Sequence, residues 1–269
     1  MNAGDPADDP ADDSGGDQQG GDQHGGQPQR SQPDPLAHRR AEPRAFAFFW
    51  TCWLLAVTAI SIGRLGNLGL SSYEIYRPAA RVLLTGVFVG CAIFWPLVRL
   101  SQERPGRPIR SFLGDLIVVV APAAAIIASQ SLPGMAGWSM AIAAYLLAYL
   151  MAWSLGLVGA LALIVNGRGS RWMGMAGCIA VASMGPMFGL VLFDAGASAD
   201  DINPWLMVSP LTVTYEITRD RFWTGDTAVV LREHMLILAG VWMTALSILV
   251  TAAVKSRAVS GLPSVRDTL

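Results

Sequence analysis

The longest uncharged run in this chain is LIVVVAPAAAIIASQSLPGMAGWSMAIAAYLLAYLMAWSLGLVGALALIVNG, residues 116–167. A helix needs about 20 apolar residues to cross the ~30 Å hydrocarbon core of a bilayer, so this run is too long for one crossing. Its polar interruption, QSLPG at 130–134, carries a Pro-Gly pair that is typical of a turn. The run therefore predicts two membrane-spanning helices joined by a short hairpin loop.

Further apolar segments lie on both sides of this pair. Only 14% of the residues are charged, against about a quarter in soluble domains. We expect an all-α, polytopic helix bundle embedded in a lipid bilayer, forming one domain over residues 44–257. The expected spans are at about residues 45–63, 79–97, 112–129, 137–165, 172–193 and 235–254.

The two ends of the chain are expected to lie outside this domain. Residues 1–43 are rich in Asp, Gly, Gln and Pro and are predicted to be a disordered acidic tail. Because the first apolar segment follows this acidic stretch, we expect it to be a retained anchor and not a cleaved signal. Residues 258–269 form a short tail. The net charge of −1, without a basic stripe, argues against nucleic-acid binding.

The positions of positively charged residues predict the orientation, because such residues beside helix ends are retained on the cytoplasmic side. Placing both termini in the cytoplasm puts about twice as many arginines and lysines inside as outside. Arginine is plentiful, whereas Lys255 is the only lysine, a bias typical of GC-rich genomes. We therefore expect the plasma membrane of a bacterium, the inner membrane.

Small residues spaced four apart predict close helix contacts, because they let two backbones approach in lipid. The second span has a GxxxG pair, and the fourth has a ridge that we interpret as a packing seam or a dimer interface. The alternative is that alanine is simply frequent here. The residues are Gly86 and Gly90, and Ala144, Ala148, Ala152, Gly156 and Ala160.

Two features towards the end of the chain involve proline. Gly185 and Pro186 are expected to weaken or kink the fifth span, because proline removes a backbone hydrogen bond and crowds the preceding turn. The long connection at 194–233 contains Asn-Pro and Ser-Pro pairs, which start turns. Its residues could dip into the membrane interface, or the connection could be a surface loop over the outer ends of the helices. The residues of this candidate element are Asn203, Pro204, Trp205, Ser209 and Pro210.

The sequence predicts no catalytic residue, cofactor or metal site, and no enzyme activity. The three cysteines lack metal-ligand spacing. Ser139 and Ser154 lie in incomplete versions of the GxSG motif of rhomboid-type proteases, and His234 is the only histidine beyond the N-terminal region. Two such serines without a complete motif do not predict a nucleophile.

In the second half, Gly156 and Gly159 are followed by Arg168 and Arg171, then by the Asn-Pro pair at 203 and the Ser-Pro pair at 209. This order resembles the membrane (permease) subunit of ABC-2-type exporters. Those subunits have six helices with both ends cytoplasmic, a Gly-rich fourth helix, a short arginine-bearing inner turn and such an outer-loop element. The inner loop at 99–110 departs from the family, because it lacks the usual Glu-rich stretch.

The resemblance implies a non-catalytic transport subunit that works with a separate ATPase, and a homodimer follows from the resemblance alone. The ATPase would dock on the arginines of the inner loop, Arg99, Arg104, Arg107 and Arg110. A different class of function is also open, that of a structural or accessory membrane protein. Such a protein would anchor or stabilise a complex without any transport activity.

Overall fold

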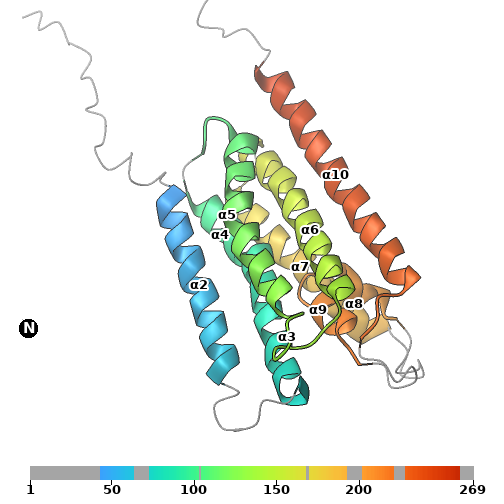
Figure 1. The fold of residues 1–269 in the computed structure, drawn as a ribbon. Helices are drawn as coiled ribbons and strands as arrows, with labels where there is room; N and C mark the ends of the chain where they lie inside the picture. The colour runs from blue at the N-terminus through green and yellow to red at the C-terminus, as the bar shows by residue number, and fades with distance from the viewer. Residues whose placement is uncertain are drawn as a thin grey trace, which may run out of the picture. The chain divides into compact units, whose positions relative to one another are not determined.

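The structure is a computed structural model that describes residues 43–63, 73–102, 104–167, 170–192, 202–220 and 228–260 (Figure 1). All regular elements in these ranges are helical. Within these ranges, 6 helices are long and apolar enough to cross a membrane, so the predicted all-α, six-span architecture is confirmed. Most of the predicted tails lies outside the described residues.

The spans are formed by the following helices. The first is α2 (Pro43–Gly63), and the second is a composite of α3 (Tyr73–Val89), a π-helical turn η1 (Gly90–Phe94) and α4 (Trp95–Ser101). The others are α5 (Pro108–Ser129), α6 (Met140–Asn166), α7 (Arg171–Leu192) and α10 (Arg232–Ser260). Two short helices, α8 (Pro204–Val208) and α9 (Val213–Ile217), lie between α7 and α10 in the sequence.

The π-helical turn in the second span has a local cause. Pro96 has no N–H, and its ring would crowd the carbonyl four residues earlier in a regular α-helix. The backbone widens just before it, and the Trp95 N–H donates to the Gly90 carbonyl, five residues back. The span therefore continues past the proline without ending.

The predicted turn between the third and fourth spans is also present. Gly134 has a φ of 86°, a backbone conformation that a residue with a Cβ rarely adopts. The two helices it connects, α5 and α6, pack against each other. The uncharged run at 116–167 therefore folds as the expected hairpin.

With an even number of crossings, α2 begins and α10 ends at the same end of the bundle (Figure 1). We call this the arginine end, because the connection at 102–107 with Arg104 and Arg107 lies there. The opposite end, where α8 and α9 lie, is called the loop end.

Burial differs strongly among the spans. α6 is the central helix. In its most apolar stretch of 18 residues, 61% is buried, whereas the corresponding stretches of α7 and α10 are only 17% buried. Large apolar side chains on these two helices are exposed, among them Met187 and Met243. Such surfaces are stable in lipid and not in water. The chain is a multi-pass membrane protein.

The GxxxG pair of the second span contacts α2. A Cβ on Gly86 would lie 2.2 Å from Val57 Cγ1, and a Cβ on Gly90 would lie 2.3 Å from Trp53 Nε1. The Trp53 indole N–H donates to the Gly86 carbonyl at 3.1 Å, and its ring stacks on Phe94. The missing side chains therefore allow α2 to approach the second span closely.

Candidate functional site

Residues 202–220 of the long connection form a folded element, which we call the loop element, built from α8 and α9. Asn203 starts α8, because its Oδ1 accepts from the N–H groups of Trp205 (3.0 Å) and Leu206 (3.4 Å). Pro204 suits the first helical position, where an N–H has no partner. The Ser209 hydroxyl oxygen in turn accepts from the Leu211 N–H at 3.2 Å.

The loop element is packed into the loop end of the bundle, beside α3, α7 and α10 (Figure 1). Its buried residues are Asn203, Met207, Ser209, Pro210, Val213, Thr214, Glu216, Ile217 and Thr218. Trp205 is partly exposed, and its ring lies 5.3 Å from that of Phe188 on α7. The described part of the connection is therefore built into the bundle, in contrast to a loop lying over its surface.

The two proline features of the sequence meet in space. Pro186 cannot donate to the carbonyl of Ala182, one turn earlier, and the Ser209 hydroxyl donates to that carbonyl at 2.6 Å. Gly185 permits this contact, since a Cβ there would lie 2.3 Å from Ser209 Cβ. α7 continues through Pro186 as one helix. The freed carbonyl thus receives a partner from the loop element.

A second link joins the loop element to α6. The hydroxyl of the fully buried Tyr149 donates to the Val208 carbonyl at 2.5 Å and accepts from the Trp153 indole N–H at 2.8 Å. Tyr145, one turn earlier on α6, donates to the His234 carbonyl at 3.0 Å. The loop element is therefore hydrogen-bonded to both α6 and α7.

A third link joins the loop element to α3 through charged groups. Arg77 and Arg81 each form a salt bridge of 3.1 Å with Asp220. Arg81 also donates to the Thr218 carbonyl at 2.6 Å, and the hydroxyls of Thr85 and Thr214 lie 2.8 Å apart. The last turn of the loop element is thereby fixed to the start of the second span.

An apolar cavity of about 780 Å³ lies between α6, α7 and α10, and Val208 of the loop element also lines it. Small residues from all three helices contribute to its wall, among them Gly156, Gly177 and Ala245. Val181 and Gly240, which also line it, are exposed, so the cavity opens onto the surface that faces lipid. Its lining suits a hydrocarbon group.

The predicted ridge of small residues on α6 has more than one environment. Ala144 is exposed and Ala148 is half-buried, so the ridge is not one continuous seam. Ala152, Gly156 and Ala160 line the apolar cavity. The α6 backbone approaches α10 closely at Gly159, where a Cβ would lie 2.8 Å from Leu249 Cα.

At the arginine end, the structure separates Arg99 from the other candidate docking residues. Arg99 pairs with Asp115 of α5, and the two side chains are only 9% and 5% exposed. It also lies 5.0 Å above the Phe46 ring and donates to Gln102 Oε1 at 2.5 Å. The Arg99 side chain is thus used inside the bundle, so its docking role stays a prediction with no exposed group behind it.

Arg104, Arg107 and Arg110 are exposed, so they remain candidates for docking. Arg171 donates to the Gln102 carbonyl at 2.6 Å and so joins α7 to the end of α4. Arg168, the other arginine of the predicted inner turn, lies outside the described residues.

No family model, curated protein or solved structure matches this chain. Within the described residues, no group of three or more His, Cys, Asp or Glu side chains is arranged to hold a metal ion. The features that carry a functional argument are therefore the apolar cavity, the loop element that borders it and the exposed arginines at the opposite end.

Proposed function

We propose that this protein is the non-catalytic membrane subunit of an ABC-2-type exporter, working with a separate ATPase. In this proposal the apolar cavity between α6, α7 and α10 receives the apolar part of the substrate. The observation that carries the proposal is that the loop element lines this cavity while bonded to α6 through Tyr149 and to α7 through Ser209. In this proposal the loop element acts as a gate at the loop end.

The strength of these links suits a gate. The links through Tyr149 and Ser209 are each a single hydrogen bond, with a net value of about 0.5–1.5 kcal/mol, so each can break and re-form in a transport cycle. α7 and α10 are the least buried spans, since only 17% of the most apolar 18-residue stretch of each is buried. We propose that α7 moves away from α6, which widens the cavity and frees the loop element from α6 and α7, while Asp220 keeps it bonded to α3.

The energy for this movement would enter at the arginine end. Arg104, Arg107 and Arg110 form an exposed positive surface that fits an acidic surface on an ATPase. The excess of positive residues near this end favours placing it, with both termini, in the bacterial cytoplasm. A homodimer belongs to the same proposal, in which the exposed apolar face of α7 and α10 contacts a second copy or lipid.

Co-purification tests this function directly. The full chain is tagged, expressed in its own host and purified in mild detergent, and bound proteins are identified while ATP hydrolysis is measured. We expect an ATPase in near-equal amount. Replacing Arg104, Arg107 and Arg110 together by Glu should release it, whereas the matched triple replacement by Lys, which keeps the charge, should retain most of it.

Recovery of the intact chain without any nucleotide-binding protein would overturn the proposal. An accessory or anchoring role would then be favoured, with other co-purifying membrane proteins as its partners. Equal ATPase recovery from the wild type and the triple Glu variant would instead show that docking does not use this surface.

A further inference from the structure

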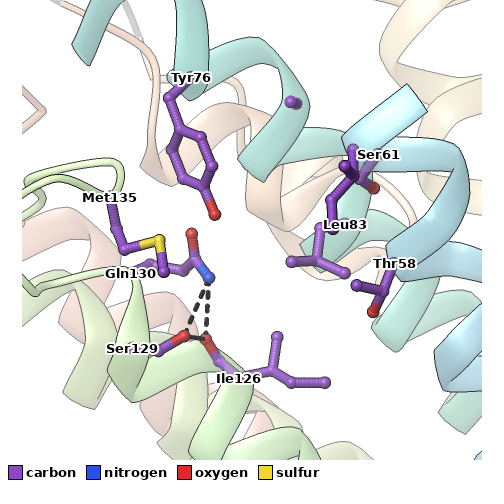
Figure 2. A pocket seen from close by; sticks show the side chains of 10 residues that line it. Thr58, Ser61, Tyr76, Leu83, Ile126, Ser129, Gln130 and Met135 are labelled. Atoms are coloured by element: carbon purple, nitrogen blue, oxygen red, sulfur yellow. Dashed lines mark hydrogen bonds between the residues drawn. The ribbon is translucent and has the colours of Figure 1, made fainter. Parts of the chain in front are cut away.

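The bundle contains a smaller cavity besides the apolar one. It has a volume of about 230 Å³ and lies between α2, α3 and α5 (Figure 2). Figure 2 shows the Gln130 amide on its wall, hydrogen-bonded to the Ser129 hydroxyl and to the Ile126 carbonyl. The apolar cavity between α6, α7 and α10 has about 780 Å³ and opens onto the surface that faces lipid. Of the two, the apolar cavity has the room for a lipid chain.

The apolar cavity is elongated along the helices. On α6 its wall extends from Ala152 to Ile164, which is about 18 Å at a helical rise of about 1.5 Å per residue. On α10 its wall extends from Ile237 to Ile248, about 17 Å. Half of a ~30 Å hydrocarbon core is about 15 Å, so the cavity is as long as the acyl chains of one leaflet are deep. An extended hydrocarbon chain therefore matches its length.

The packing of α6 against α10 shows which charged residue lies at one end of this cavity. Both helices cross from the loop end to the arginine end, so they run in the same direction (Figure 1). A Cβ on Gly159 would lie 2.8 Å from Leu249 Cα, so these two residues are at one level. Ile164 lies five residues beyond Gly159, and Lys255 lies six residues beyond Leu249. Lys255 is therefore close to the level at which the cavity wall on α6 ends.

Lys255 also lies on the face of α10 that lines the cavity. Val241 and Ile248 belong to this wall, and Lys255 is the next residue at the same spacing of seven, which is nearly two helical turns. Lys255 is exposed, and none of the salt bridges within the described ranges includes it. A lysine here extends its ammonium to the lipid head groups while its carbon stem lies against apolar surface.

A second positive group comes from α7. A Cβ on Gly174 would lie 2.7 Å from Ile164 Cγ2, and Arg171 is about one turn from Gly174 towards the arginine end. Arg171 donates to the carbonyls of Leu100 and Gln102 at 3.4 and 2.6 Å. These acceptors are uncharged, and no salt bridge among the described residues includes Arg171. Two cations, one on α7 and one on α10, thus lie at the arginine end of the cavity.

We propose that the apolar cavity binds an acyl chain of an anionic phospholipid from the leaflet at the arginine end, with the phosphate beside Lys255 and Arg171. The cavity supplies the apolar contact, and the two cations favour a head group with a net negative charge over a zwitterionic one. The inference names the ligand class of this cavity, and the role of that ligand as a transport substrate rests on the proposed function. Binding of the lipid itself needs no ATPase.

The test uses the full chain in phosphatidylcholine nanodiscs and two probes with the same diazirine-bearing acyl chain, one a phosphatidylglycerol and the other a phosphatidylcholine. Both probes contain a phosphate diester, but only phosphatidylglycerol has a net negative charge. After illumination, labelled peptides of α6 at 152–164 are quantified by mass spectrometry. We expect about five-fold more labelling by phosphatidylglycerol, the factor by which one lysine or arginine near a membrane surface favours an anionic lipid.

Three variants locate the origin of this preference. Lys255→Gln removes one charge and should remove most of the preference, whereas Lys255→Arg keeps the charge and should retain it. Arg257→Gln is the matched control, because Arg257 is exposed at the same end of α10 but lies about 200° around the helix from Lys255. It should retain the preference. Monodisperse gel filtration confirms that each variant is folded.

Equal labelling of the wild type by the two lipids, or labelling of 152–164 by neither, would overturn the proposal. A preference that Lys255→Gln leaves unchanged, or that Arg257→Gln lowers equally, would also overturn it, because this site would then not select the lipid. ATPase co-purification is measured separately. A chain that prefers phosphatidylglycerol but binds no ATPase contradicts only the proposed function, and the reverse result contradicts only this inference.

Discussion

The Ser209 hydroxyl donates to the Ala182 carbonyl at 2.6 Å, the carbonyl to which Pro186 cannot donate. Ser209 is 27 positions away from Ala182 in the chain and belongs to the loop element. The contact thus completes a helix with a side chain from another part of the protein. It also makes the state of α7 depend on the position of the loop element.

Replacing Ser209 by Ala should destabilise the protein by about 1–3 kcal/mol, because a buried carbonyl is left without its donor. Pro186→Ala restores a backbone N–H within α7. The double variant should therefore lose much less stability than Ser209→Ala alone. The measurement is the midpoint of thermal unfolding in detergent for the wild type, the two single variants and the double variant. Strictly additive effects of the two substitutions would show that Ser209 does not compensate for Pro186.

Tyr149→Phe should lower stability by about 1–3 kcal/mol, because the Val208 carbonyl loses a donor and the Trp153 N–H loses an acceptor. Ring packing is kept in this variant. Tyr215→Phe is the matched control, since Tyr215 belongs to α9 but 52% of the residue is exposed. Equal unfolding midpoints for the two variants would argue against the link between α6 and the loop element.

Arg99 and Asp115 form a buried pair, so removing one charge should cost more than removing both. Asp115→Asn should destabilise by about 3–5 kcal/mol, and Arg99→Met should have a similar effect. The double variant Arg99→Met, Asp115→Leu should recover most of that loss. Arg104→Met, at an exposed position, serves as the control and should unfold as the wild type does. A double variant no more stable than either single variant would contradict this prediction.

Gly177→Leu should fill part of the apolar cavity without loss of folding, because Gly177 lines it and a Cβ there meets nothing within 4 Å. Gly114→Leu is the control, since it has equal space on α5 and does not line the cavity. The measurement is photolabelling in vesicles by a phospholipid with a diazirine in its acyl chain. Labelling of α6 at 152–164 should fall in Gly177→Leu and stay unchanged in Gly114→Leu. Equal labelling in the wild type and both variants would show that the acyl chain binds outside this cavity.

Part of the loop element's local structure could be predicted from its motifs. The Asn-Pro and Ser-Pro pairs predicted turns, and Ser209 does form a turn, whereas Asn203 with Pro204 begins the short helix α8. The Gly86 and Gly90 spacing likewise corresponds to a close helix contact. These features depend on residues adjacent in sequence or one helical turn apart.

The role of Arg99 could not be predicted in this way. A positive residue beside a helix end has the same local pattern whether it faces water or a buried carboxylate. Asp115 lies 16 positions away, and only the packing of α5 beside the start of α2 and the end of α4 brings the two charges together. The presence of an acidic residue within the third span was the one available signal.

The positions of the six spans follow from the amino-acid sequence alone. In lipid every backbone N–H and C=O must be paired within the protein, so a run of about 20 apolar residues has to be helical. The rotation and spacing of those helices depend on side-chain packing between distant segments. The two cavities, the Ser209 contact with α7 and the buried Arg99–Asp115 pair therefore exist only in the folded bundle.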